Sequence, residues 1–249
     1  MPVITTRGAP ERTIADLYYL VITRFERLFA WTGGGLFAAS LLVCVYAYLV
    51  SWGVPDRIGG GMKAGASNVA LFLVFALHHS LFARRWTKVH MARVIPERLL
   101  RSLYVWIASL LLLIVVALWQ PVGGDLYHVT GWRAAVHAGV QLAGLWLIAR
   151  SVVLMDGLEL AGIRPHAADE ALHVEGPYRW VRHPLYLGWL LAVFGAAHMT
   201  MDRLIFAAVS ATYLVVAVPM EERSLVGTFG EDYTRYARCV RWRLVPYIY

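Results

Sequence analysis

The sequence predicts an all-α, polytopic integral membrane protein with about six transmembrane helices and a cofactor site at the cytoplasmic end of its C-terminal part. Of its 249 residues, 59% are apolar and 16% are charged, whereas soluble domains average about 45–50% and about 25%. The 10 Trp and 13 Tyr residues suit a chain anchored at membrane interfaces. This composition excludes disordered and collagen-like chains, and 2 cysteines exclude a disulfide-rich scaffold.

Six apolar segments are long enough to cross a bilayer core, which is about 30 Å thick and takes about 20 helical residues. They cover residues 33–52, 64–83, 102–120, 134–149, 185–201 and 204–220, and the fourth can extend to residue 154. Only Asp202 and Arg203 separate the last two, which predicts a tight helical hairpin over residues 185–220. We therefore expect one membrane domain, residues 1–249, with a four-helix N-terminal part at 33–154 and a catalytic C-terminal part at 155–249.

Residues 13–32 show an amphipathic pattern ahead of the first span. Leu17, Leu20 and Val21 recur at helical spacing, with Arg24 and Arg27 among them. Such a helix fits the inner leaflet of a membrane, and it fits a cytosolic lead-in helix equally well. No cleavable apolar core precedes the first span, so we expect no signal peptide.

The distribution of basic residues predicts the orientation in the membrane. Alternate connecting segments hold 19 of the 23 Lys and Arg residues. Because positively charged loops stay in the cytoplasm, both termini are expected there, which agrees with an even number of spans. The sequence carries no lipidation or retention signal, and a bacterial inner membrane is the default expectation.

The longest polar interval within the membrane part ends in a Gly-Pro turn and the segment Tyr-Arg-Trp-Val-Arg-His-Pro-Leu-Tyr-Leu-Gly, residues 178–188. Pro184 suits the first turn of a helix, where its missing N–H has no partner to lose. Arg182 and His183 then lie at the helix N-terminus, where free N–H groups and the helix dipole favour an anion. Simple interfacial anchoring by Arg179 and Arg182 is an equally good interpretation.

Two adjacent carboxylates, Glu221 and Glu222, follow the last span at the same expected depth. Acids so close to lipid should face protein, water or a cationic ligand. A ligand with an anionic and a cationic group would satisfy both acids together with Arg182 and His183. A structural salt bridge to Arg179 or Arg182 is the alternative.

These residues resemble a known family. The pattern is Gly176-x-Tyr178-x3-Arg182-His183-Pro184-x-Tyr186-x-Gly188, followed by Glu221-Glu222 and by Phe229-Gly230-x2-Tyr233-x2-Tyr236. Over about residues 170–246 it is similar to the isoprenylcysteine carboxyl methyltransferase superfamily of integral-membrane methyltransferases that use S-adenosylmethionine. Upstream, His78-His79-Ser80 and Arg98-x2-Arg101-Ser102-x-Tyr104 resemble the bacterial branch that includes methanethiol S-methyltransferase.

The resemblance implies S-adenosylmethionine as the cofactor and assigns its contacts position by position. The implied cofactor-binding residues are Glu170, His173, Tyr178, His183, Pro184, Tyr186 and Glu221. Methyl transfer needs no metal, and no phosphate-binding loop, zinc-protease motif, nucleophile elbow or paired-Cys motif occurs in the chain. We therefore expect no metal and no nucleic acid.

Candidate catalytic residues follow from the need to handle the proton of a methyl acceptor. His78 and His79 lie low in the second span and titrate near neutrality, although a buried structural histidine is the alternative for either. Adjacent residues face different sides of a helix, so at most one is expected to act. Arg182 and Glu222 complete the candidates.

The acceptor itself is expected to be small and apolar. In the carboxyl methyltransferases of the superfamily an Arg precedes the cofactor-binding glutamate by one turn, and the matching position is Ala217. A carboxylate would enter this pocket without a counter-charge from that helix, which is unfavourable. We rank methylation of a small thiol such as methanethiol first, methylation of a lipid amine second, with Glu222 as the spare acid, and esterification of a prenylcysteine third.

Two other function classes compete. Membrane sterol reductases that use NADPH carry a related Arg-His-Pro-Asn-Tyr motif, but this chain has Leu185 after the proline and Trp189 after the glycine. A transporter or scaffold would have broken helices at mid-membrane, paired in two halves.

Phe229, Tyr233 and Tyr236 share one helical face, which predicts a tail that folds back over the site rather than lying on lipid headgroups.

Overall fold

The computed structural model describes residues 24–54, 58–164 and 172–249. Most of the expected interfacial helix, residues 13–32, and the candidate Glu170 therefore lie outside the described residues. Among the described residues, five helices are long and apolar enough to cross a membrane, as expected for an all-α polytopic membrane protein. They are α2 (Arg24–Leu49), α3 (Gly61–Ala83), α5 (Glu97–Ala117), α6 (Gly131–Leu154) and α9 (Met201–Phe229).

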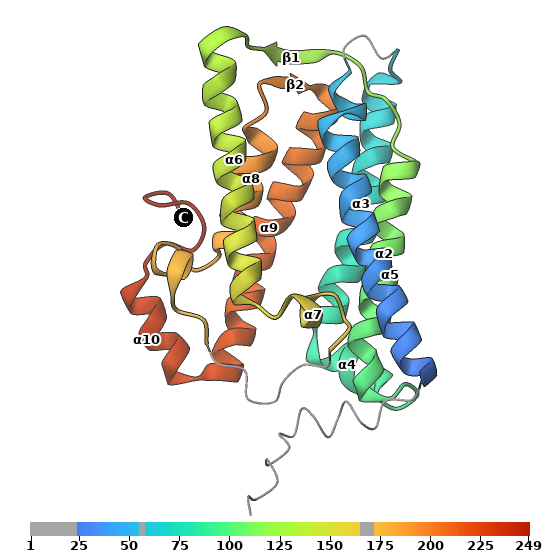
Figure 1. Cartoon of the computed structure of the whole chain (residues 1–249), viewed down its shortest axis with the longest axis vertical. Helices are drawn as coiled ribbons and strands as arrows, with labels where there is room; N and C mark the ends of the chain where they lie inside the picture. Colours follow the sequence, from blue (N-terminus) through green and yellow to red (C-terminus); the bar gives the residue numbers. More distant parts are fainter. Residues whose placement is uncertain (1–23, 55–57, 165–171) are drawn as a thin grey trace, which may run out of the picture.

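Shorter elements connect these helices. They are η1 (Ser51–Gly53), α4 (Arg85–Met91), β1 (Asp125–His128), α7 (Gly157–Leu160), η2 (Gly176–Arg179), α8 (Pro184–Phe194), β2 (His198–Thr200) and α10 (Glu231–Cys239). Figure 1 shows β1 and β2 at one end of the bundle, and α4, α7 and α10 toward the other end. The start of α2 lies at the same end as α4, so the described Arg-rich segments gather at one end.

The fifth span is shorter than expected. The sequence predicts a helix over residues 185–201, but α8 has 11 residues and ends at Phe194. At 1.5 Å per residue such a helix covers about 16 Å, about half of a bilayer core. After α8 the chain passes through Gly195 to β2, which pairs antiparallel with β1.

Asp202 and Arg203 do not form the turn of the hairpin, which is a correction to the sequence-based expectation. Both are buried in the first turn of α9, and the chain reverses before them, at β2. Arg203 donates hydrogen bonds to the carbonyl oxygens of Tyr48 and Leu49, and Asp202 accepts one from the indole N–H of Trp119 at 2.8 Å. These partners make burial of the charged pair tolerable.

The last span is longer than expected. The sequence predicts a helix over residues 204–220, whereas α9 continues through Pro219 to Phe229 and ends where Gly230 adopts a φ of 55°. Glu221 and Glu222 therefore lie inside a helix rather than in a tail. Their side chains point in different directions, since successive residues on an α-helix are about 100° apart.

Glycines bring α8 close to α6 and so fix the element that carries the motif. A Cβ at Gly188 would lie 2.8 Å from the carbonyl oxygen of Gly144, and a Cβ at Gly144 would lie 2.6 Å from that of Gly188. Small residues at such crossings allow close backbone packing in membranes. The main apolar core lies nearer the β1–β2 end, around Trp52, Trp119 and Phe206.

Candidate active site

The segment before α8 is held by the C-terminal end of the chain. The backbone N–H groups of Arg182 and His183 donate to the carbonyl oxygens of Trp242 and Arg243, each at 2.9 Å. The sequence predicts that free backbone N–H groups here would bind an anion, but these two N–H groups are hydrogen-bonded to the protein itself. Pro184 occupies the first turn of α8, as its missing N–H allows.

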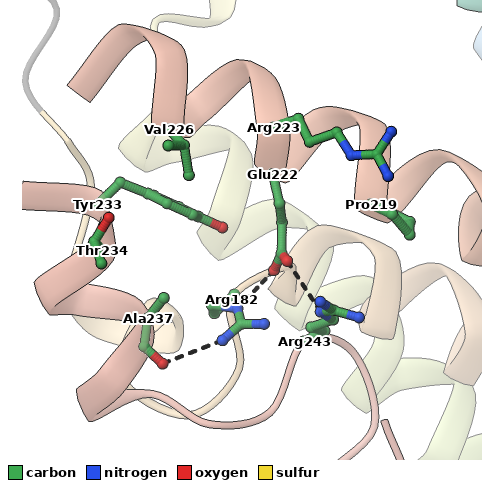
Figure 2. Close-up of a pocket in the computed structure, with 9 residues that line it drawn as sticks. All are labelled: Arg182, Pro219, Glu222, Arg223, Val226, Tyr233, Thr234, Ala237 and Arg243. Carbon is green, nitrogen blue, oxygen red and sulfur yellow. Dashed lines mark hydrogen bonds and ion pairs between the residues drawn. The ribbon is translucent and has the colours of Figure 1, made fainter. Parts of the chain in front are cut away.

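Glu222 is enclosed by two arginines (Figure 2). Its Oε1 lies 2.6 Å from Nε of Arg182, and its Oε2 lies 2.9 Å from Nε of Arg243. Arg182 also donates to the carbonyl oxygens of Ala237 and Val240. The side chains of Arg182 and Glu222 are only 9% and 12% exposed, so this pair joins α8, α9 and the tail as a buried structural ion pair.

Glu221 is the more accessible of the two acids. Its side chain is 42% exposed, against 12% for Glu222. One carboxylate oxygen, Oε2, accepts a hydrogen bond from the Tyr186 hydroxyl at 2.7 Å. The carboxylate is thus oriented by one partner from α8 and still open to a ligand.

His183 lies between the two carboxylates. Its ring stacks on that of Tyr186 with centroids 5.5 Å apart, and its nitrogens lie 3.8 Å from Glu221 Oε2 and 3.5 Å from Glu222 Oε1. Burial lowers the pKa of His183 below its usual value, although both carboxylates oppose this effect. The ring is therefore neutral at neutral pH and can act as a hydrogen-bonding wall of the site.

Helix α10 of the C-terminal tail packs against the segment before α8. Tyr236 of α10 donates to the carbonyl oxygen of Tyr178 at 2.8 Å, and the Tyr178 ring lies 6.3 Å from that of His173. Tyr233 and Tyr236 are buried, and burial raises the pKa of both hydroxyls, which stay protonated. Phe229 belongs to α9 instead, and Gly230 separates it from the two tyrosines.

A pocket of about 530 Å³ opens beside Glu222, between α9 and α10 (Figure 2). Its lining residues are Arg182, Pro219, Glu222, Arg223, Val226, Tyr233, Thr234, Ala237 and Arg243. Arg243 is a residue that the sequence reasoning missed. The cluster of four basic residues after α9 was the available signal, but only the folded tail shows which of them meets Glu222.

His78 and His79 lie in α3, where both contact Tyr104 of α5. The Tyr104 hydroxyl is 2.5 Å from Nδ1 of His79, and the Tyr104 ring stacks on that of His78 with centroids 5.7 Å apart. His79 also meets the Tyr213 ring of α9 at 6.0 Å. The two histidines therefore share Tyr104 as a neighbour. A second cluster, at α8 and α9, consists of Arg182, His183, Tyr186, Glu221 and Glu222.

Known proteins resemble this chain over most of its length. The model of the isoprenylcysteine carboxyl methyltransferase (ICMT) family matches residues 159–227, which include α8 and most of α9. The methanethiol S-methyltransferase of Crocosphaera subtropica is 33% identical over 84% of this chain and 88% of its own length. Methanethiol S-methyltransferase 2 of Bradyrhizobium diazoefficiens is 35% identical over 79% of this chain and 78% of its own length.

A more distant relative is Nurim of Danio rerio, 28% identical over 70% of this chain and 69% of that protein. No solved structure matches the chain. The family match falls on the segment that carries the clustered acids, Arg182 and His183, and the Crocosphaera and Bradyrhizobium relatives, both above 30% identity, are named methyltransferases. The chain therefore belongs to the isoprenylcysteine carboxyl methyltransferase family and is a membrane methyltransferase.

Proposed function

We propose that this protein transfers a methyl group from S-adenosylmethionine to a small thiol, of which methanethiol is the type, at the cytoplasmic face of a bacterial inner membrane. The observation that carries the proposal is that the two adjacent acids have different partners and different exposure. Glu222 is taken up by Arg182 and Arg243, which leaves Glu221, beside Tyr186 and His183, as an oriented and accessible carboxylate.

The donor set fits S-adenosylmethionine. The ligand has a carboxylate, an ammonium group, ribose hydroxyls and a sulfonium cation, and it supplies an activated methyl group when bound. Glu221 can accept from the ammonium or the ribose hydroxyls, while the stacked rings of His183 and Tyr186 offer an aromatic face to a cation. Pro184 starts the helix that positions them, and we extend the proposed contacts to Tyr178, His173 and Glu170.

The charges of α9 favour an uncharged acceptor. No charged residue occurs in α9 between Arg203 and Glu221, and Ala217 lies one turn before Glu221. An acceptor carboxylate would have no counter-charge on this stretch of α9, between Arg203 and Glu221, and leaving a buried charge unpaired costs several kcal/mol, about 3–5 in measured cases. A thiol needs only an apolar path and a proton acceptor. The named relatives are methanethiol S-methyltransferases, which agrees with this ranking.

Product analysis tests the proposal. Purified protein receives methyl-labelled S-adenosylmethionine with methanethiol, phosphatidylethanolamine or a prenylcysteine in separate reactions. We expect labelled dimethyl sulfide from the first and at most a trace of label in the other two. Labelled prenylcysteine ester or methylated lipid amine without dimethyl sulfide would overturn the assignment of the acceptor, and consumption of NADPH without methyl transfer would overturn the reaction class.

A further inference from the structure

A polar path crosses the apolar bundle between the proposed cofactor site and α3. It begins at Glu221, which accepts a hydrogen bond from Tyr186, and continues at Tyr213, about two turns before Glu221 on α9, whose ring lies 6.0 Å from that of His79. At its far end the Tyr104 hydroxyl contacts His79. The path includes residues of α9, α8, α5 and α3, so it links both parts of the chain.

Among the described members of this path, His79 is the one that offers an imidazole nitrogen to a methyl acceptor, and Tyr104 holds its ring. In the tautomer that donates Nδ1–H to the Tyr104 hydroxyl at 2.5 Å, Nε2 carries the lone pair and lies 3.2 Å from the same hydroxyl. Tyr213 and Phe75 flank the ring at 6.0 and 5.9 Å, which gives it apolar neighbours of the kind that a small thiol would meet. The described titratable groups that face His79 are Tyr104 from α5, Tyr213 from α9 and His78 on its own helix.

The other candidates for the proton acceptor, His78 and Arg182, are less suited to that role. His78 packs between Phe82 and Tyr104, with centroid distances of 4.6 and 5.7 Å, and neither ring nitrogen has a hydrogen-bond partner among the described residues. Arg182 donates to Glu222 and to two carbonyl oxygens, and a guanidinium does not give up its proton in proteins. Neither residue offers both a side chain oriented by a hydrogen bond and a nitrogen lone pair that can accept a proton.

We propose that His79 is the proton acceptor for the methyl acceptor and that Tyr104 is the residue that positions its ring. This inference rests on the proposed function and adds the acceptor side of the site. The thiol S–H bond breaks as its proton passes to Nε2 of His79, and the thiol sulfur forms a bond to the methyl carbon. The bond between that carbon and the sulfonium breaks with its electron pair left on the donor sulfur. The imidazolium then returns the proton to water.

The test compares His79→Gln and Tyr104→Phe with the parent protein, and uses His137→Gln in α6 as a matched control. General bases contribute about 100-fold or more to rate. We expect kcat for methanethiol at pH 7 to fall about 100-fold in His79→Gln and about 10-fold in Tyr104→Phe. Each variant should keep the affinity for S-adenosylmethionine, which shows that its fold and cofactor site are intact.

The pH profile separates a proton acceptor from a merely structural histidine. Since a thiolate needs no base, the deficit of His79→Gln should shrink about tenfold for each pH unit between 7 and 9. Methaneselenol, which has nearly the same shape and is ionised at neutral pH, should restore most of the rate. A deficit that stays constant with pH and with the selenol would overturn the proposal, as would a loss in His78→Gln but not in His79→Gln.

Carbon-13 NMR of histidine-labelled protein gives a readout that does not depend on turnover. In a complex with sinefungin, a cofactor analogue that cannot transfer its group, the signal that His79→Gln removes should shift when methanethiol is added. An unchanged signal would contradict contact between the thiol and His79. Parent protein that makes no dimethyl sulfide would refute the proposed function itself, whereas active parent protein with an equally active His79→Gln variant would refute only this inference.

Discussion

At the residue scale, the adjacent acids Glu221 and Glu222 differ in role because their side chains leave α9 in different directions and meet different partners. Glu222 meets Arg182 and Arg243, whereas Glu221 meets Tyr186 and remains 42% exposed. The sequence predicted that acids and bases would meet at this end of the bundle. It left open whether they form a salt bridge or a ligand site, because only the position of Arg243 shows which acid is neutralised.

The Arg182–Glu222 pair is expected to stabilise the fold. Replacing Glu222 with Gln leaves Arg182, only 9% exposed, without its counter-charge. Breaking a buried pair in this way costs about 3–5 kcal/mol, so the thermal midpoint should fall strongly. The matched control is Asp232→Asn, which removes a pair with Arg235 whose side chains are both 74% exposed. That change should cost less than about 0.5 kcal/mol, and equal shifts for the two variants in a thermal-shift assay would contradict the account.

The pH dependence of stability should report the burial of His183. Its pKa in the folded protein lies below the ordinary value of 6.5, with burial as the main cause. The unfolded chain therefore binds the proton more readily, so stability is complete above about pH 6.5 and declines as the pH falls through that value. His183→Gln should flatten this decline between about pH 6.5 and 5, while the exposed His90→Gln should keep it. A parent-like slope in His183→Gln would show that another group is responsible.

At the element scale, the six apolar segments were predictable, but the ends of the last two were not. The sequence placed the hairpin turn at Asp202 and Arg203 because charged residues usually mark the ends of spans. Their partners, Tyr48, Leu49 and Trp119, come from distant parts of the chain and do not show in a local pattern. Helix α9 likewise passes Pro219, and Gly230 ends it.

The close packing of α6 on α8 should be essential for positioning the site. A Cβ at Gly188 would lie 2.8 Å from the carbonyl oxygen of Gly144 and 3.0 Å from the backbone nitrogen of Ile148. Gly188→Ala must therefore push α8 away, which costs about 1–3 kcal/mol and moves Tyr186 and His183. We expect a lower thermal midpoint and weaker binding of S-adenosylmethionine.

The control for this change lies on α6 itself. Gly139 has nothing within 4 Å of a Cβ built on it, so Gly139→Ala should leave both quantities unchanged or raise stability slightly, by up to about 1 kcal/mol. If Gly188→Ala bound the cofactor as tightly as Gly139→Ala, the packing of α8 would not set the geometry of the site.

At the scale of the whole molecule, the Arg-rich described segments and the proposed cofactor site share one end of the bundle, while β1 and β2 lie at the other. The positive-inside rule predicts that the first end lies in the cytoplasm. Cys239 of α10 is exposed, whereas Cys44 is buried. A membrane-impermeant maleimide should therefore label Cys239 in inverted vesicles and not in intact cells.

A second variant completes the topology test. Leu126 in β1 is 56% exposed, and Leu126→Cys combined with Cys239→Ser should be labelled in intact cells instead. The opposite pattern for the two proteins would reverse the orientation and place the site outside the cytoplasm.

The most direct test of the central claim is calorimetric titration of S-adenosylmethionine into the purified parent protein, Glu221→Gln and Glu231→Gln. Glu231 is an exposed acid in the first turn of α10 and serves as the control. If Glu221 is the acid that holds the cofactor, Glu221→Gln should lose at least about tenfold in affinity, or about 1.4 kcal/mol, while Glu231→Gln binds like the parent. Equal affinity in all three proteins, or no binding to the parent, would contradict the account.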